Sequence, residues 1–101
     1  MSTAAVQLNE TGVLSLSGVL DYRSGPALRK EGQALIGSSS APVLVLDCSA
    51  VEKSSSVGLS LLLAFVRDAK AAGKGFEVRA MPHDMREIAE VYDLDEVLAG
   101  Q

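Results

Sequence analysis

The sequence predicts an α/β domain whose mixed, mostly parallel sheet of about four strands is covered by helices. Three features predict it: two short strand-like segments open the chain, a continuous apolar run lies at Val43–Leu46, and helix-like segments alternate with strand-like ones from Ser24 onward. The 101 residues leave room for one domain, which we assign to residues 1–101. We expect the order β-β-α-β-α-β-α, with a hairpin feeding parallel units whose crossovers are right-handed.

The first half of the chain supplies the hairpin and one helix. Val6–Leu8 and Val13–Leu20 predict two short strands, because apolar residues alternate with other residues in the second segment. Asn9–Gly12 supplies the turn between them, so an antiparallel hairpin is the simplest outcome. Ser24–Pro26 predicts a helix start, since serine caps helices and proline suits their first turn. Gly37 is expected to end that helix.

The second half alternates between strands and helices. Val43–Leu46 lacks alternation and ends at Asp47, so we expect a central strand with both faces covered. A helix should follow from about Ser56 to Ala72 and close at Gly73. Apolar alternation predicts one more strand, and Pro82 opens a third helix that a last short helix follows. The residues behind these expectations are Phe76, Val78 and Ala80 for the strand, Met85, Ile88, Ala89 and Tyr92 for the third helix, and Leu94, Val97 and Leu98 for the last.

Charge and hydropathy narrow the possible partners and the compartment. The chain carries 9 basic and 13 acidic residues without a basic stripe, which argues against nucleic acid and anionic membranes as partners. Apolar runs such as Leu61–Val66 are far shorter than the roughly 20 residues of a membrane span, so we expect no direct membrane insertion. The N-terminus lacks a signal-peptide pattern, so we expect a cytoplasmic protein. Six acids from Asp84 to Glu96 predict a solvated helix face or a steering surface for a basic partner.

The residues that catalysis would need are scarce. The chain has one histidine, His83, and one cysteine, Cys48, too few for a structural zinc site or a Cys–His dyad. We expect His83 to be exposed in a first helical turn and Cys48 to pack in the core. Gly73–Gly75 lies between a helix and a strand, the wrong order for a phosphate-binding loop. We therefore predict no enzyme, no catalytic or metal-binding residue and no cofactor.

The segment Asp47–Leu59 is the most informative part of the chain. We expect it to leave the carboxyl end of the central strand and enter the second helix, the place where open α/β sheets usually carry their sites. Ser54, Ser55 and Ser56 then lie beside a helix N-terminus, which favours a negative charge. A phosphoryl group on Ser55 or Ser56 would be well placed there. Capping of the helix by one of the serines is the alternative to which we give more weight.

The second helix carries apolar residues on two arcs. Leu59, Leu62 and Val66 belong to its core stripe, together with Leu63 and Ala69. Val57, Leu61, Ala64 and Phe65 fall on another arc at about 100° per residue, and that arc needs a cover of its own. The cover is either a neighbouring helix or a partner protein; both stay open for Phe65, and a partner is favoured for Val57 and Leu61. The predicted interface comprises Ser54, Ser55, Ser56, Val57, Gly58, Leu61 and Phe65.

Four segments in this order resemble the STAS domain family, the fold of bacterial anti-sigma factor antagonists. Gly18–Asp21 resembles its G-x-L-D motif, and Val43–Val51 resembles its central strand. Ser55–Leu59 falls on its D-S-[ST]-G-[LIV] signature, and Ala71–Lys74 on the end of the helix that follows. The resemblance covers nearly the whole chain and implies a STAS-type fold.

The resemblance also implies roles for the serines. In the family's antagonists a partner kinase phosphorylates the first hydroxyl residue of the signature, and the aspartate before it supports the switch. Ser56 matches the phosphoacceptor, whereas Ser55 replaces the aspartate and Val57 replaces the second hydroxyl residue. Replacing a carboxylate by a hydroxyl removes a charge and an acceptor beside Ser56.

Within the family, Gly58–Leu63 and Ile88–Leu94 are similar to single-domain accessory subunits of phospholipid ABC transporters in Gram-negative bacteria. That similarity implies binding to the ATPase subunit, inside a complex with a membrane permease and a lipid-binding subunit that maintains outer-membrane lipid asymmetry. The chain itself would bind neither lipid nor ATP. The alternative is an anti-sigma factor antagonist regulated by phosphorylation of Ser56.

Overall fold

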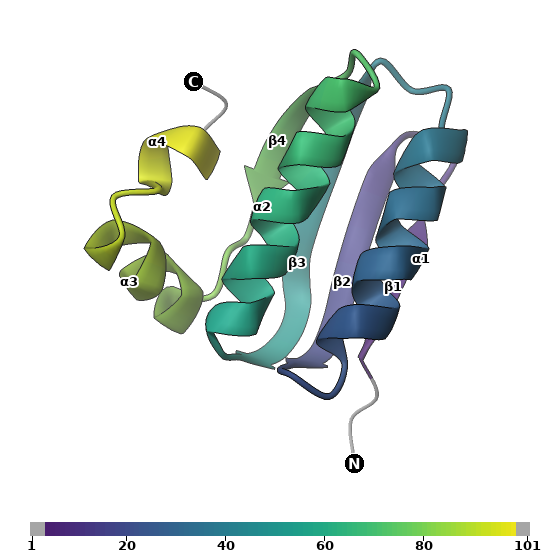
Figure 1. Ribbon diagram of the computed structural model, residues 1–101. Helices are drawn as coiled ribbons and strands as arrows, with labels where there is room; N and C mark the ends of the chain where they lie inside the picture. The colour runs from purple at the N-terminus through teal and green to yellow at the C-terminus, as the bar shows by residue number, and fades with distance from the viewer. Residues whose placement is uncertain (1–3, 99–101) are drawn as a thin grey trace.

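The computed structural model describes residues 4–98, which form one four-stranded sheet in the order β1-β2-β3-β4 with helices packed against it (Figure 1). The elements confirm the predicted order and the short last helix. Their bounds are β1 Ala5–Leu8, β2 Val13–Leu20, α1 Gly25–Ser38, β3 Val43–Ser54, α2 Ser56–Ala71, β4 Gly75–Arg79, α3 His83–Val91 and α4 Asp95–Leu98. None of the helices in the described range is long and apolar enough to span a bilayer.

The strands pair as the sequence predicts. β1 and β2 form an antiparallel hairpin, and β2–β3 and β3–β4 are parallel. The Asn9 carboxamide oxygen closes the hairpin turn by accepting from the Thr11 and Val13 N–H groups at 3.0 and 2.9 Å. Gly12 completes the turn with a φ of +93°, which favours glycine. Helices α1 and α2 connect the parallel strands by right-handed crossovers (Figure 1).

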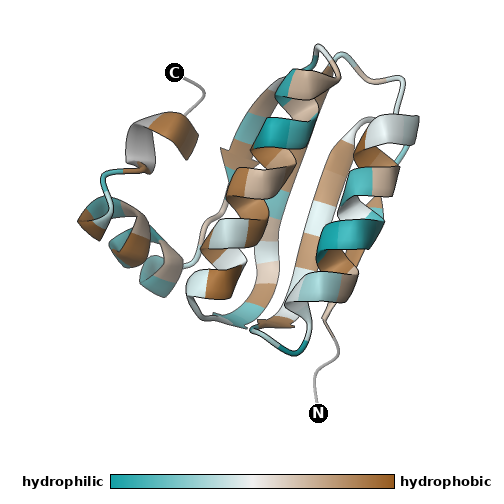
Figure 2. Ribbon diagram, in the orientation of Figure 1, coloured by the Kyte–Doolittle hydropathy of each residue, from teal (hydrophilic) through white to brown (hydrophobic). Residues whose placement is uncertain are grey.

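The core lies between the sheet and the helices. β2 alternates buried residues that face the helices, among them Leu14, Leu16 and Leu20, with half-buried residues that face away. Figure 2 shows brown, hydrophobic segments on β2 and on the helices that cover it. Apolar side chains of α2 and of the helix-facing side of β3 complete this layer. Its fully buried large members include Leu14, Leu16, Leu20, Ile36, Leu44, Leu46, Leu62, Phe65 and Met85.

The other face of the sheet is open, so the expectation that Val43–Leu46 has both faces covered is wrong. Val43 is 49% exposed and Val45 is half-buried, whereas Leu44 and Leu46 are completely buried. Two right-handed crossovers that advance in one direction along the sheet place both helices on the same side. Within residues 4–98 no helix lies on the opposite side (Figure 1). The continuous valine–leucine run reflects strand propensity and not double burial.

Several boundaries also differ from expectation; α2 ends one residue early at Ala71, and Ala80 lies just beyond the end of β4. β3 continues to Ser54, because β2 remains its hydrogen-bonding partner as far as the Leu20–Ser54 pair. α1 runs through Gly37 and ends at Ser38, where the Ser39 N–H reaches the last-turn carbonyls. Tyr92 follows the end of α3 and is 65% exposed, so it is not part of the core, although Met85 and Ala89 of the same predicted stripe are buried.

Candidate functional site

The starts of α1 and α2 lie at one edge of the sheet, where β2 and β3 end (Figure 1). The Ser55 N–H donates to the Leu20 carbonyl at 3.0 Å, which ties the entrance of α2 to the end of β2. Because β3 extends to Ser54, Ser55 alone links it to α2, and Asp47–Ser54 is strand where we expected a loop. The predicted location at the carboxyl edge of the sheet nevertheless holds for Ser54 onward.

The three serines differ in what their hydroxyls do. Ser55 is the N-cap of α2, and its Oγ accepts from the Val57 N–H at 3.1 Å, as the capping alternative predicts. Ser54 is buried, and its hydroxyl donates to the Ser55 carbonyl at 2.8 Å. Ser56, the first residue of α2, is exposed. Of the three hydroxyls, that of Ser56 is therefore the one an external molecule can reach without displacing a cap or a buried contact.

Gly58 sits in a tight contact that explains the glycine of the family signature. A Cβ there would lie 2.0 Å from the Ser54 hydroxyl and 3.1 Å from the Met85 methyl carbon. Met85 is completely buried, so α3 packs on the first turn of α2 through this side chain. Gly58 thus lets β3, α2 and α3 converge, and its backbone is buried and unavailable to a partner.

The second apolar arc of α2 is covered in large part by α1, which removes Phe65 from the predicted interface. Phe65 is completely buried, and its ring lies where Gly32 leaves space: a Cβ at Gly32 would be 2.3 Å from its Cε1. Of the two covers left open for Phe65, the neighbouring helix is the one that the structure contains. Leu61 is 4% exposed, which is less than its assignment to a partner surface implies, and Val57 is half-buried.

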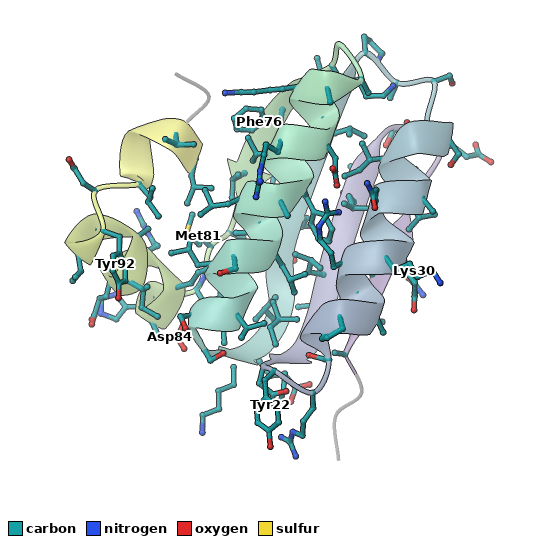
Figure 3. All side chains as sticks on the ribbon, viewed as in Figure 1. Tyr22, Lys30, Phe76, Met81, Asp84 and Tyr92 are labelled. Carbon is teal, nitrogen blue, oxygen red and sulfur yellow. The ribbon has the colours of Figure 1, made fainter. Side chains whose placement is uncertain are left out.

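A groove remains open between the first turns of the two helices. We call it the helix-start groove; it has a volume of about 360 Å³, and its surface is mainly apolar. Val57 lies close to α1 here, because a Cβ on Gly25 would be 2.8 Å from its Cγ1. Tyr22 is 76% exposed and projects beyond the helix starts at this edge (Figure 3). The groove is lined by Tyr22, Gly25, Pro26, Arg29, Val57, Ser60 and Leu61.

Charged side chains stand beside this groove. The Asp21 carboxylate accepts from the Arg23 side chain at 2.8 and 3.2 Å and from its N–H at 2.9 Å. These hydrogen bonds lower the pKa of Asp21 and raise that of Arg23. Arg29 bridges the two helices by binding Asp68 at 2.7 Å. Lys53, the residue before the serines, is exposed.

Cys48 and His83, for which we expected no catalytic role, lie where the sequence predicts them, in the core and in the first turn of α3. Cys48 is buried, and burial, together with the charge of Asp47, raises the pKa of its thiol to about 12. His83 is exposed and pairs with Glu87 one turn along α3. Asp84, Glu87 and other acids of α3 are also exposed. In the part of the chain that the structure describes, no group of three His, Cys, Asp or Glu side chains could hold a metal ion.

Sequence reasoning missed five of the seven residues that line the groove. Tyr22, Pro26 and Arg29 belong to the β2–α1 connection and α1, and none of them is in the predicted interface. One signal could have found them: strands that run parallel end at the same edge, so the segment after Asp21 had to lie beside the serines. An exposed aromatic residue next to that edge is typical of binding surfaces.

These features define a class of protein: a small α/β domain with a four-stranded mixed sheet and an apolar groove at the shared start of two helices. The chain belongs to the STAS domain family, because the family model described as "Mlab, STAS domain" matches residues 4–99.

Solved structures have the same fold. An anti-sigma factor antagonist from Mycobacterium paratuberculosis is 33% identical, with a TM-score of 0.68 over 96% of this chain and 82% of that chain. The MlaB chain of the Acinetobacter MlaFEDB complex in an ATP-bound conformation has a TM-score of 0.80 at 23% identity, over 93% and 96% of the two chains. The anti-sigma factor antagonist SpoIIAA, in its unphosphorylated form, has a TM-score of 0.65 at 15% identity, over 94% and 97%. The last two similarities establish the fold alone.

Proposed function

We propose that this chain is a non-catalytic accessory subunit that binds the MlaF-like ATPase of a phospholipid ABC transporter and supports its assembly and activity. The complex would also contain a membrane permease and a lipid-binding subunit, and would maintain outer-membrane lipid asymmetry. The chain would be cytoplasmic, held at the inner membrane through the ATPase alone, and would bind no cofactor, lipid or nucleotide.

The helix-start groove is the observation that carries this proposal. It offers an open apolar surface next to the exposed Ser56, with Val57 on one wall and Tyr22 on its rim. An apolar side chain of a partner protein would gain contact area there without unfolding any part of this chain. The match of the MlaB-type family model to residues 4–99 supports an ABC ATPase as that partner.

The serines favour a constitutive subunit over a phosphorylation switch. The position that carries the supporting aspartate in phosphorylated family members is Ser55 here, and its hydroxyl is already used as the cap of α2. A hydroxyl provides no negative charge to orient or activate the neighbouring Ser56. The interface in this proposal consists of Ser55, Ser56 and Val57 with the rim of the groove, while Leu61 forms its floor.

Binding to the ATPase subunit of the same organism tests the proposal. Replacing Ser56 by arginine should weaken binding at least 100-fold in calorimetric titration, because it places a bulky charge at the centre of the contact. Gln33→Arg is the matched control, since this residue is exposed on α1 outside the groove and should bind like wild type. Equal binding by both variants, with unchanged thermal unfolding, would place the interface elsewhere.

A second function, an anti-sigma factor antagonist regulated by phosphorylation, is favoured by two observations. Ser56 is exposed at the position that matches the family's phosphoacceptor, and the 33% identical Mycobacterium paratuberculosis protein is an anti-sigma factor antagonist. Incubation with an anti-sigma-type serine kinase and ATP, followed by mass spectrometry, separates the two functions. Stoichiometric phosphate on Ser56 without ATPase binding would support the antagonist, and the reverse result would support the transporter subunit.

A further inference from the structure

β1 is an edge strand, and within residues 4–98 no other strand pairs with its outer side. The Asn9 N–H donates to the Val13 carbonyl at 3.0 Å, and the register continues as Leu8–Leu14, Gln7–Ser15 and Val6–Leu16. In an antiparallel ladder, alternate residue pairs exchange hydrogen bonds. Asn9 and Gln7 therefore direct their backbone groups to β2, whereas Val6 and Leu8 direct theirs to the open edge.

A second groove runs beside this edge, between β1 and α1. We call it the β1 groove. It has an apolar floor, because the side chains of Val6 and Leu8 turn toward the helices and are buried and half-buried. On the α1 side of the groove, Ala34 contributes only a methyl group and Leu35 is half-buried. The groove is lined by Val6, Gln7, Leu8, Glu31, Ala34, Leu35 and Ser38.

We propose that the β1 edge binds an extended peptide segment of another protein, which adds a fifth strand to the sheet. Such a segment would pair with the outward N–H and C=O groups of Val6 and Leu8. Its alternate side chains would point into the β1 groove, since side chains of an added strand follow the pleat of its neighbour. The backbone hydrogen bonds of the edge strand would thus provide affinity for the segment, and the groove beside it would select the segment's side chains.

The negative charge beside the β1 groove indicates which residues the bound segment should contain. Glu31 is the charged residue of the lining, and its side chain is exposed on the helix wall. A segment that carries a lysine or arginine between apolar residues complements it. A second copy of this chain fits less well, because a symmetric pairing through the same edge brings two copies of Glu31 and no basic lining residue.

Amide hydrogen exchange with a defined probe tests the proposal. The probe is a short acetylated and amidated peptide that alternates valine with threonine and carries one lysine. Saturation should slow exchange at the Val6 and Leu8 amides about tenfold or more, because these groups become hydrogen-bonded. The Gln7 amide already donates to β2 and should change little, which makes it an internal control. A peptide with proline in place of the central valine cannot donate there and should not protect either amide.

Two exposed residues give variants that leave the fold intact. Ala34→Trp fills the β1 groove and should abolish protection, and Glu31→Lys should weaken probe binding about fivefold by charge reversal. Gln33→Lys, outside the lining, is the control and should bind like wild type. Protection that Ala34→Trp leaves intact, or no protection at millimolar probe, would overturn the proposal. Protection that grows with protein concentration in the absence of probe would overturn it in favour of a second copy.

This site is independent of the helix-start groove. Ala34→Trp should bind the ATPase with unchanged affinity, and Ser56→Arg should bind the peptide probe with unchanged affinity. A result that refutes one of the two proposed sites therefore does not refute the other. If Ala34→Trp also lost the ATPase, the two grooves would form one interface and the separate peptide site would be refuted.

Discussion

Helices α1 and α2 lie side by side over the sheet, yet their contact is closed in the middle and open at the start. In the middle, the Phe65 ring fills the space that Gly32 leaves, and it is completely buried. At the start, Val57 touches α1 near Gly25 but remains half-buried, and the helix-start groove stays open beside it. We call these the closed and the open parts of the contact.

The difference shows how one apolar arc can serve two purposes. A ring packed against a glycine excludes water and fixes the distance between the helices. Where Tyr22, Pro26 and Arg29 line the contact instead, a mainly apolar groove remains open. The closed part thus holds the geometry of the open part, and the two can be perturbed separately.

The largest effect should come from filling the closed part. Gly32→Ala places a Cβ 2.3 Å from the Phe65 ring, so the ring or α1 must shift. Overpacking of this kind costs about 1–3 kcal/mol, and we expect the upper end because a rigid ring and a helix backbone oppose each other. Chemical denaturation should show this loss, and ATPase binding should weaken as the helix starts move apart. Wild-type stability in this variant would mean that the closed part does not set the helix spacing.

The free energy of unfolding should depend on alkaline pH through Cys48, a buried residue of β3 in the sheet beneath both parts. Its pKa is raised to about 12 in the folded chain from 9.0, so the folded state holds the thiol proton more tightly than the unfolded chain does. Stability should therefore be constant below pH 9 with respect to this group and fall above it, by at most about 1.4 kcal/mol per pH unit. Cys48→Ala should remove this slope when unfolding is measured from pH 8 to about 11. A slope identical to wild type would assign it to other groups.

The start of the open part depends on the Ser55 cap. Ser55→Ala removes the acceptor of the Val57 N–H and should lower the free energy of unfolding by about 1 kcal/mol. Ser55→Asp keeps a capping oxygen and restores the carboxylate of the family signature, so it should be as stable as wild type. If Ser56 then became a kinase substrate, the missing carboxylate would be what separates this chain from phosphorylated antagonists. A loss of stability in Ser55→Asp would contradict the capping role.

The smallest effect should come from Gly37→Ala at the end of α1, which makes the same substitution as Gly32→Ala at a position without close neighbours. A Cβ at Gly37 would meet no atom within 4 Å. Gly37→Ala should therefore stabilise the chain by about 0.5–1 kcal/mol, through helix propensity and a less flexible unfolded chain. Thermal unfolding of Gly32→Ala and Gly37→Ala side by side should give shifts of opposite sign.

Much of the fold follows from local sequence patterns. Alternation in Val13–Leu20, the turn at Asn9–Gly12 and the proline after Ser24 each specify an element through short-range steric and hydrogen-bonding preferences. The convergence of the strand ends and helix starts at one edge was also predictable, because it follows from chain order and parallel pairing. The capping role of a serine followed from the chemistry of helix starts.

Burial and strand length required the tertiary structure. Both helices cover one face, so the valines of Val43–Leu46 border an open surface that a continuous apolar run does not reveal. β3 extends to Ser54 because β2 offers it a partner, which is a contact between residues more than 30 positions apart. Whether Phe65 is buried within the chain depended on Gly32, because the absence of a side chain there matters only when α1 lies against α2. Sequence periodicity states which side chains share a face, whereas packing between distant segments decides which of those faces remains free to bind.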